Sequence, residues 1–178
     1  MNTTRFNVKK MVLAALMLAL CMVLPFLTGQ IPQIGSALLP MHFPVLLCGF
    51  VCGGPWGAAV GFVAPLLRYL LFGMPPIYPT GLAMAFELAT YGLVSGLVYA
   101  KAKKHTLPMI YAALVTAMVA GRLVWGVVRF LMAGLAGTAF TLDAFLAAVV
   151  LGSIPGIILL LILIPLLVVA LQRAKVIE

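Results

Sequence analysis

Long runs of apolar residues, each close in length to a bilayer-spanning helix, dominate this sequence. A helix needs about 20 apolar residues to cross the hydrocarbon core, with a lower limit of about 17. The runs are continuous rather than alternating in polarity, which favours helices over a β-barrel. The sequence therefore predicts an all-α integral membrane protein, a single domain over 1–178 built as a bundle of six transmembrane helices. The predicted helices cover residues 8–27, 41–53, 56–72, 79–100, 107–133 and 142–171.

The composition excludes a soluble domain. Hydrophobic residues make up 65% of the 178 residues and charged residues only 8%, which leaves too little polar surface to cover a core of this size. The formal net charge of +8 would suggest a nucleic-acid partner in a soluble protein. Here most of the excess lies at the ends of apolar runs, where it reports topology, so no nucleic-acid partner is predicted.

The basic residues predict the orientation of the bundle. They gather at the N-terminus (Arg5, Lys9, Lys10), in the loop 101–104 and in the tail after residue 171, whereas loops 28–40, 73–79 and 134–141 contain no Lys or Arg. An even number of spans places both termini on one side, and basic loops remain in the cytoplasm. We therefore expect both termini to be cytoplasmic in a multi-pass protein of a prokaryotic plasma membrane.

Isolated charges inside the apolar runs are the candidate functional residues, because an ionisable group in a membrane span is expensive to bury. The predicted orientation brings them, with Asp143, toward the outer leaflet. Tyr91 shares a helical face with Glu87, and Trp125 shares one with the nearby arginines. The sequence thus predicts a polar pocket open to the outside, and its candidate substrate-binding residues are Arg68, Glu87, Tyr91, Arg122, Trp125 and Arg129.

Three arginines face two carboxylates in this predicted pocket. The excess positive charge favours a ligand with a carboxylate or another anionic group, held by guanidinium forks. The Gly/Pro-rich connectors 28–40 and 73–79 would lie above the pocket as lids. A purely structural alternative remains, in which Glu87 pairs with Arg68 or Arg129 only to permit burial.

Known catalytic and metal-binding motifs are absent from the sequence, so we expect neither an enzyme, nor a metal, nor a cofactor. There is no GxxxxGK[ST], H-E-x-x-H or G-x-S-x-G pattern. Cys21, Cys48 and Cys52 lie in apolar runs and are interpreted as packing residues rather than ligands. His42, at the start of the short second run, is interpreted as an interfacial histidine, with a polar contact to the pocket as the alternative.

Two features resemble a known family. Ala15 and Ala19 form a small-xxx-small pair, which lets another helix approach closely within a bilayer. The stretch from Leu39 to Leu97, including LPMHFPVLLCGFVCGGPWGAAVGFVAPLLRYLLFGMPPIYPTG, is similar to helices 2 to 4 of substrate-binding S components of energy-coupling factor (ECF) vitamin transporters. The resemblance implies capture of a scarce vitamin near the outer face. It also implies docking of Ala15 and Ala19 on a transmembrane T component, and two cytoplasmic ATPase subunits that supply the energy.

The predicted excess of positive charge favours a carboxylate-bearing vitamin or precursor such as pantothenate, with folate, niacin and lipoate behind it. A cationic ligand such as thiamine would favour more acids than bases. The competing function is a self-sufficient small secondary transporter or channel. Inverted internal repeats would support that alternative, and none is evident in the sequence.

Overall fold

The computed structural model describes residues 8–28, 37–102, 106–149 and 151–176, and every regular element in these ranges is helical. The basic residues Arg5, Lys103 and Lys104 and the predicted lid residues 29–36 lie outside the described residues. The elements are α1 (Val8–Val23), η1 (Leu24–Thr28), α3 (His42–Cys52), α4 (Gly54–Phe72), η2 (Ile77–Gly81), α5 (Leu82–Ala100), α6 (Leu107–Leu135), α7 (Leu142–Val149), η3 (Leu151–Ser153) and α8 (Ile154–Arg173).

Five helical segments of the described chain are long and apolar enough to cross a membrane: Val8–Leu27, Gly54–Phe72, Ile77–Ala100, Leu107–Leu135 and Ile154–Arg173. The helix α3 is equally apolar but has only 11 residues, a length of about 16 Å, or roughly half of a hydrocarbon core. The prediction of an all-α, multi-pass membrane protein is therefore confirmed for these residues.

Proline explains where the helices differ from the predicted ranges. The range 142–171, predicted as one helix, is divided into α7, η3 and α8, and Pro155 occupies the first turn of α8. A proline lacks the N–H for the preceding turn and clashes with the carbonyl four residues back, so α8 starts afresh there. Pro165 lies inside α8 without ending it. Before α5, Tyr78 is extended (φ −117°, ψ 133°), as expected for a residue that precedes a proline.

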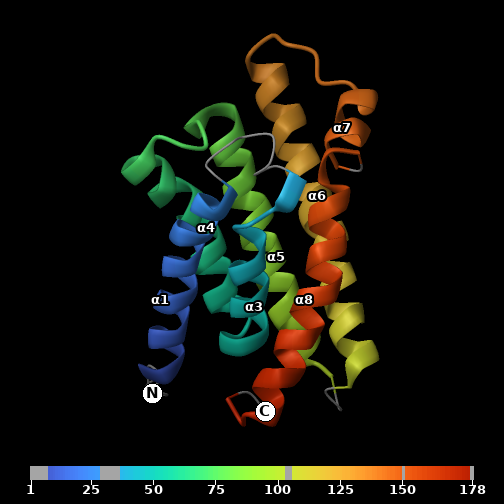
Figure 1. Ribbon diagram of the computed structural model, residues 1–178. Helices are drawn as coiled ribbons and strands as arrows, with labels where there is room; N and C mark the ends of the chain where they lie inside the picture. Colours follow the sequence, from blue (N-terminus) through green and yellow to red (C-terminus); the bar gives the residue numbers. More distant parts are fainter. Residues whose placement is uncertain (1–7, 29–36, 103–105, 150, 177–178) are drawn as a thin grey trace, which may run out of the picture.

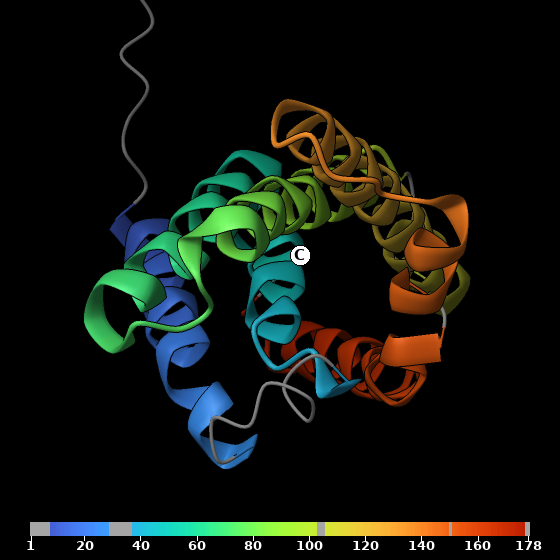
Figure 2. The same cartoon turned by 90° about the horizontal axis from the view of Figure 1, so that it is seen from above.

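The short helix α3 lies inside a ring formed by the other helices (Figures 1 and 2). It packs against α1, α4, α5 and α8, and nine of its 11 residues are buried. Because α3 has 11 residues and the helices packed against it have 16 to 20, it fills only part of the length of the bundle interior. Its first residue, His42, is thereby placed inside the bundle rather than at a membrane surface.

Glycines join α4 and α5 at very short range. A Cβ built on Gly92 of α5 would overlap the backbone of Gly57 in α4, and one built on Gly61 would overlap the carbonyl of Leu88. Gly57 and Gly61, like Gly92 and Gly96, are four residues apart, the spacing that lets two membrane helices pack backbone to backbone. This contact fixes the position of Glu87, one residue before Leu88.

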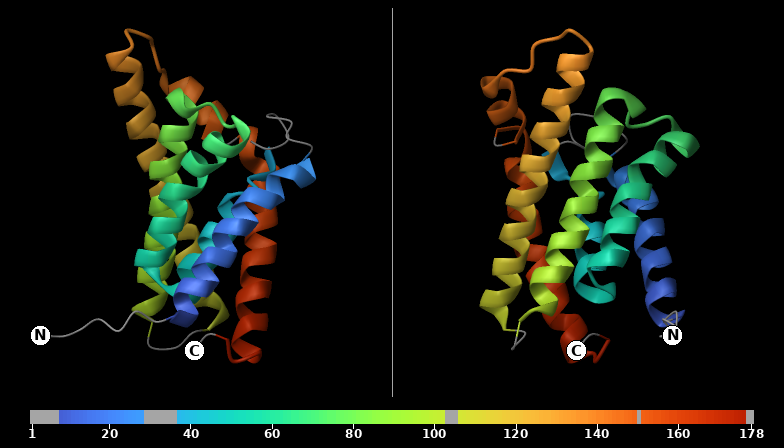
Figure 3. Two further views of the ribbon diagram at one scale, coloured as in Figure 1. Left: turned by 90° about the vertical axis from the view of Figure 1, so that its left-hand side faces the viewer. Right: turned by 180° about the vertical axis from the view of Figure 1, so that it is seen from behind.

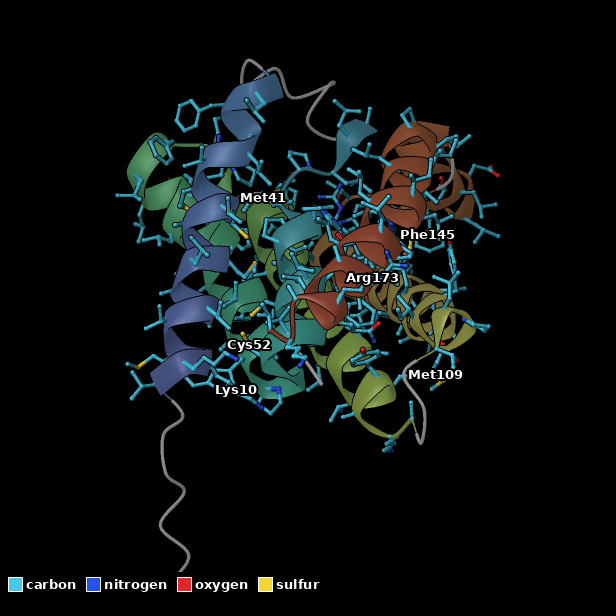
Figure 4. All side chains as sticks on the ribbon, turned by 60° about the horizontal axis from the view of Figure 1, so that its bottom comes forward. Lys10, Met41, Cys52, Met109, Phe145 and Arg173 are labelled. Atoms are coloured by element: carbon cyan, nitrogen blue, oxygen red, sulfur yellow. The ribbon has the colours of Figure 1, made fainter. Side chains whose placement is uncertain are left out.

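The start of α1, the end of α5, the start of α6 and the end of α8 lie at one end of the bundle (Figures 1 and 3). We call it the basic end, and the opposite end, with residues 73–76 and 136–141, the distal end. Figure 4 shows Lys10 and Arg173 from the side of the basic end. The Lys9 ammonium donates a hydrogen bond to the carbonyl of Val176 at 3.2 Å, which ties the first and last helices together.

Candidate functional site

Glu87 lies in the interior of the bundle and is 2% exposed. Its Oε1 is 2.9 Å from Nη1 of Arg122, which reaches it from α6. The two helices approach closely because Gly121 precedes this arginine: a Cβ there would lie only 3.1 Å from the Tyr91 ring and 3.2 Å from the Glu87 carbonyl oxygen. The pairing that the sequence suggested, of Glu87 with Arg68 or Arg129, is therefore wrong, since the partner is Arg122.

A histidine and a tyrosine complete this group. His42 enters from the start of α3, and its Nε2 is 3.5 Å from the same carboxylate oxygen of Glu87. Its ring packs edge to face on Tyr91, with 5.2 Å between ring centroids. Three helices, α3, α5 and α6, thus bring together what we call the polar core: His42, Glu87, Tyr91 and Arg122.

Several polar atoms of the polar core are buried without a hydrogen-bond partner among the described residues. They are both ring nitrogens of His42, the Tyr91 hydroxyl and Nη2 of Arg122. Oε1 of Glu87 has the ion pair with Arg122 and the 3.5 Å approach of His42. Leaving such groups unsatisfied costs about 1–3 kcal/mol each. A buried group with spare donors and acceptors is the arrangement expected where a polar ligand binds.

Toward the distal end, α6 carries a second group. The Trp125 ring stacks on Phe145 of α7 (centroids 6.2 Å apart, planes at 29°) and meets Phe140 edge to face at 5.9 Å. A Cβ on Gly126 would overlap the Phe145 ring, so this glycine leaves the space on α6 that the ring occupies. We call Trp125, Phe140 and Phe145 the aromatic cluster.

Arg129 lies over the aromatic cluster. Its guanidinium carbon is 5.7 Å from the Trp125 ring centroid and 5.6 Å from that of Phe140. Cation–π contacts of this kind contribute about 0.5–2 kcal/mol but do not neutralise the charge. The buried Nε of Arg129 has no hydrogen-bond partner, and the ion pairs recorded for the described residues do not include this side chain. Arg129 is thus a partly buried cation that has no counter-ion among the described residues.

Arg68 lies elsewhere, between α1 and α4. It is 3% exposed, and its Nη1 donates a hydrogen bond to the Met22 carbonyl at 2.7 Å. The rings of Phe26 and Phe72 each lie 5.2 Å from its guanidinium carbon. Arg68 therefore joins α4 to the end of α1. Asp143, the other predicted charge, is exposed in the first turn of α7.

The sequence interpretation missed three residues of the two groups. His42 was interpreted as interfacial, with a polar contact to the pocket as the alternative; it is 2% exposed and faces Glu87, which favours the alternative. The signal was the shortness of its apolar run: a helix of 11 residues that ends near one membrane surface cannot reach the other, so its first residue lies in the interior. Phe140 and Phe145 were not singled out, because nothing in a loop and a short apolar run distinguishes a cluster member from a lipid-facing residue.

Ala15 and Ala19 are exposed on α1, whereas Ala14, Met17 and Cys21 on the opposite face are buried. The small-residue pair is therefore not used for packing within the described chain. The three cysteines are free and buried. Within the described ranges, no three His, Cys, Asp or Glu residues gather closely enough to hold a metal ion.

The chain was compared with known proteins. The family described as "ECF transporter, substrate-specific component" matches residues 9–171. Comparison with curated proteins and with solved structures found no match.

Proposed function

Because the chain belongs to the family of substrate-specific components of ECF transporters, we propose that it captures one water-soluble vitamin or related micronutrient that carries an anionic group. In this function the chain binds and releases its ligand without chemical change. Import requires the partner subunits that hydrolyse ATP.

One observation carries the anionic character of the ligand. In the described interior, the Glu87 carboxylate is matched by the Arg122 guanidinium at 2.9 Å, which leaves Arg129 with no acid and with an unpartnered Nε. A ligand carboxylate would supply the missing charge and would accept charge-assisted hydrogen bonds from this guanidinium. Pantothenate satisfies this requirement and is our first candidate substrate.

The proposed topology has six apolar helices, α3 included, with both termini in the cytoplasm of a prokaryotic cell. The grouping of Lys9, Lys10, Lys101, Arg173 and Lys175 at element ends that meet at the basic end supports this orientation. The aromatic cluster, on the part of α6 nearer the distal end, then lies toward the outer side of the membrane.

The proposed partners are a transmembrane T component and two cytoplasmic ATPase subunits. The exposed Ala15 and Ala19 offer a flat strip on α1 where a helix of the T component would pack closely. Their exposure supports a docking role, because side chains this small contribute little to packing against lipid.

Purification and reconstitution test the proposal. The protein is extracted in detergent, and mass spectrometry identifies any compound that co-purifies with it. The same protein is then placed in liposomes alone, or together with T and ATPase subunits and ATP. We expect an anionic micronutrient in the first experiment and uptake only with the partner subunits in the second. Uptake by the chain alone would instead identify a self-sufficient transporter.

A further inference from the structure

We propose that the compound bound by this chain is bipolar: its acidic group lies at Arg129 beside the aromatic cluster, and an uncharged end bearing hydroxyl or amide groups reaches the polar core. This inference rests on the proposed function and specifies the class of substrate. It follows from the different charge of the two groups and from the distance between them.

The polar core suits an uncharged end. Its cation and its acid, Arg122 and Glu87, already form an ion pair, so a further full charge would gain little there. Within the described ranges, the atoms left without a hydrogen-bond partner are the Tyr91 hydroxyl, the His42 nitrogens and Nη2 of Arg122. Tyr91 and His42 are 0% and 2% exposed. Hydroxyl and amide groups both donate and accept hydrogen bonds, and therefore match this mixed set.

Arg129, beside the aromatic cluster, suits the acidic end of the ligand. Arg129 is a cation in the described chain without an ion-pair partner, and its Nε is buried and unpartnered. The rings of Trp125 and Phe140 flank the guanidinium, and Arg129 is only partly exposed. A carboxylate here forms the charge-assisted bonds that no residue of the described chain provides.

The two groups are separated by a defined length. Arg122 and Arg129 are seven residues apart on the continuous helix α6, which corresponds to two turns and about 10 Å, on one helical face. An extended chain spans this length in about eight bonds. Trp125 lies between the two arginines on α6, where its ring can cover an aliphatic or amide spacer.

Binding measurements with three related probes test both ends separately. Pantothenate has a carboxylate at one end and a terminal hydroxyl eight bonds away. In panthenol a primary alcohol replaces the carboxylate, and N-(3,3-dimethylbutanoyl)-β-alanine lacks both hydroxyls but keeps the carboxylate. Affinities are measured by calorimetry for the wild type, Arg129→Gln and Tyr91→Phe, with Arg173→Gln and Tyr111→Phe as matched controls on the exterior.

For the wild type we expect panthenol to bind roughly 10- to 100-fold more weakly than pantothenate, and the dehydroxylated probe roughly 3- to 10-fold more weakly. Arg129→Gln should abolish the preference for pantothenate over panthenol and retain the preference over the dehydroxylated probe. Tyr91→Phe should reduce the preference over the dehydroxylated probe, because His42 and Arg122 still offer hydrogen bonds, and should retain the preference over panthenol. Controls should retain both. Variants that weaken all three probes equally, or that exchange these effects, would overturn the proposal while leaving the transport function intact.

If the wild type binds none of the three probes, the co-purified compound decides. A carboxylate separated by eight to ten bonds from a hydroxyl or amide group supports the bipolar class. A micronutrient with a single polar end, or a cation, overturns it but agrees with a binding subunit. A chain that binds no micronutrient yet transports alone contradicts the proposed function as well.

Discussion

Removal of one member of the Glu87–Arg122 pair should destabilise the protein far more than removal of both. Glu87→Leu leaves the Arg122 guanidinium inside the bundle without a counter-ion, and Arg122→Met does the same to the carboxylate. The double variant replaces both charges by apolar side chains of similar size. A double-mutant cycle isolates the energy of the pair because each single change removes the same contact.

The magnitude follows from the geometry. At the observed 2.9 Å between Oε1 and Nη1, two unit charges attract each other by about 6 kcal/mol at an effective dielectric constant of about 20. Breaking a buried pair by removing one partner typically costs about 3–5 kcal/mol, whereas replacing the whole pair is nearly neutral. His42, 3.5 Å from the carboxylate, can compensate part of the loss in Arg122→Met. We therefore expect Glu87→Leu to be the more destabilising of the two single changes.

The assay is reversible unfolding of the ligand-free protein in mixed detergent micelles, followed by tryptophan fluorescence. Each single variant should lose about 3–5 kcal/mol of unfolding free energy, and the double variant should return to within about 1 kcal/mol of the wild type. Arg173→Met, which removes an exposed charge at the end of α8, should change stability by less than about 0.5 kcal/mol. Single effects that simply add in the double variant would refute a buried, coupled pair.

Two further predictions concern contacts outside the polar core. Ala15→Trp should abolish uptake by the reconstituted transporter yet leave ligand affinity within about threefold of the wild type, because the side chain projects from the exposed face of α1. The control Ala112→Trp, at an exposed position on α6, should retain uptake, and an equal loss of uptake in both variants would argue against docking. Gly92→Ala should destabilise the protein by about 1–3 kcal/mol because the added methyl overlaps the backbone of α4. The control Gly134→Ala, with open space around its Cβ, should be neutral or slightly stabilising, and an equal effect of the two substitutions on stability would show that the close helix contact is not required.

The periodic, continuous apolar runs were sufficient to predict the class of fold. Helix breaks were harder, since a proline in a membrane helix can be tolerated or can end it. Pro165 remains within α8, whereas α8 starts afresh around Pro155. The difference lies in the neighbours: Gly152 and Ser153 precede Pro155 and leave the chain free to change direction, whereas Pro165 is surrounded by Leu and Ile.

The candidate site was predictable by depth but not by direction. The predicted orientation, together with the positions of Glu87, Arg122 and Arg129 in their apolar runs, placed these residues in one part of the membrane, where an ionisable residue needs a partner. It could not show which way Arg68 points, since its position on α4 is compatible with a neighbour on either side. The structure directs Arg68 toward Met22 in α1, away from the Glu87–Arg122 pair. Rotation of a helix about its axis is set by packing with all its neighbours, which a single sequence does not record.

The glycine contacts between α4 and α5 have a consequence for how such a protein diversifies. Where two backbones touch, as at Gly57 and Gly92, any side chain larger than hydrogen would overlap the neighbouring helix. We therefore expect few substitutions to be tolerated at this interface. The α6–α7 side of the site contains Trp125 and Phe145, large side chains that smaller or polar ones can replace without moving a backbone. We expect a change of ligand preference to arise there, while the α4–α5 pair is inherited unaltered as the frame that keeps Glu87 in place.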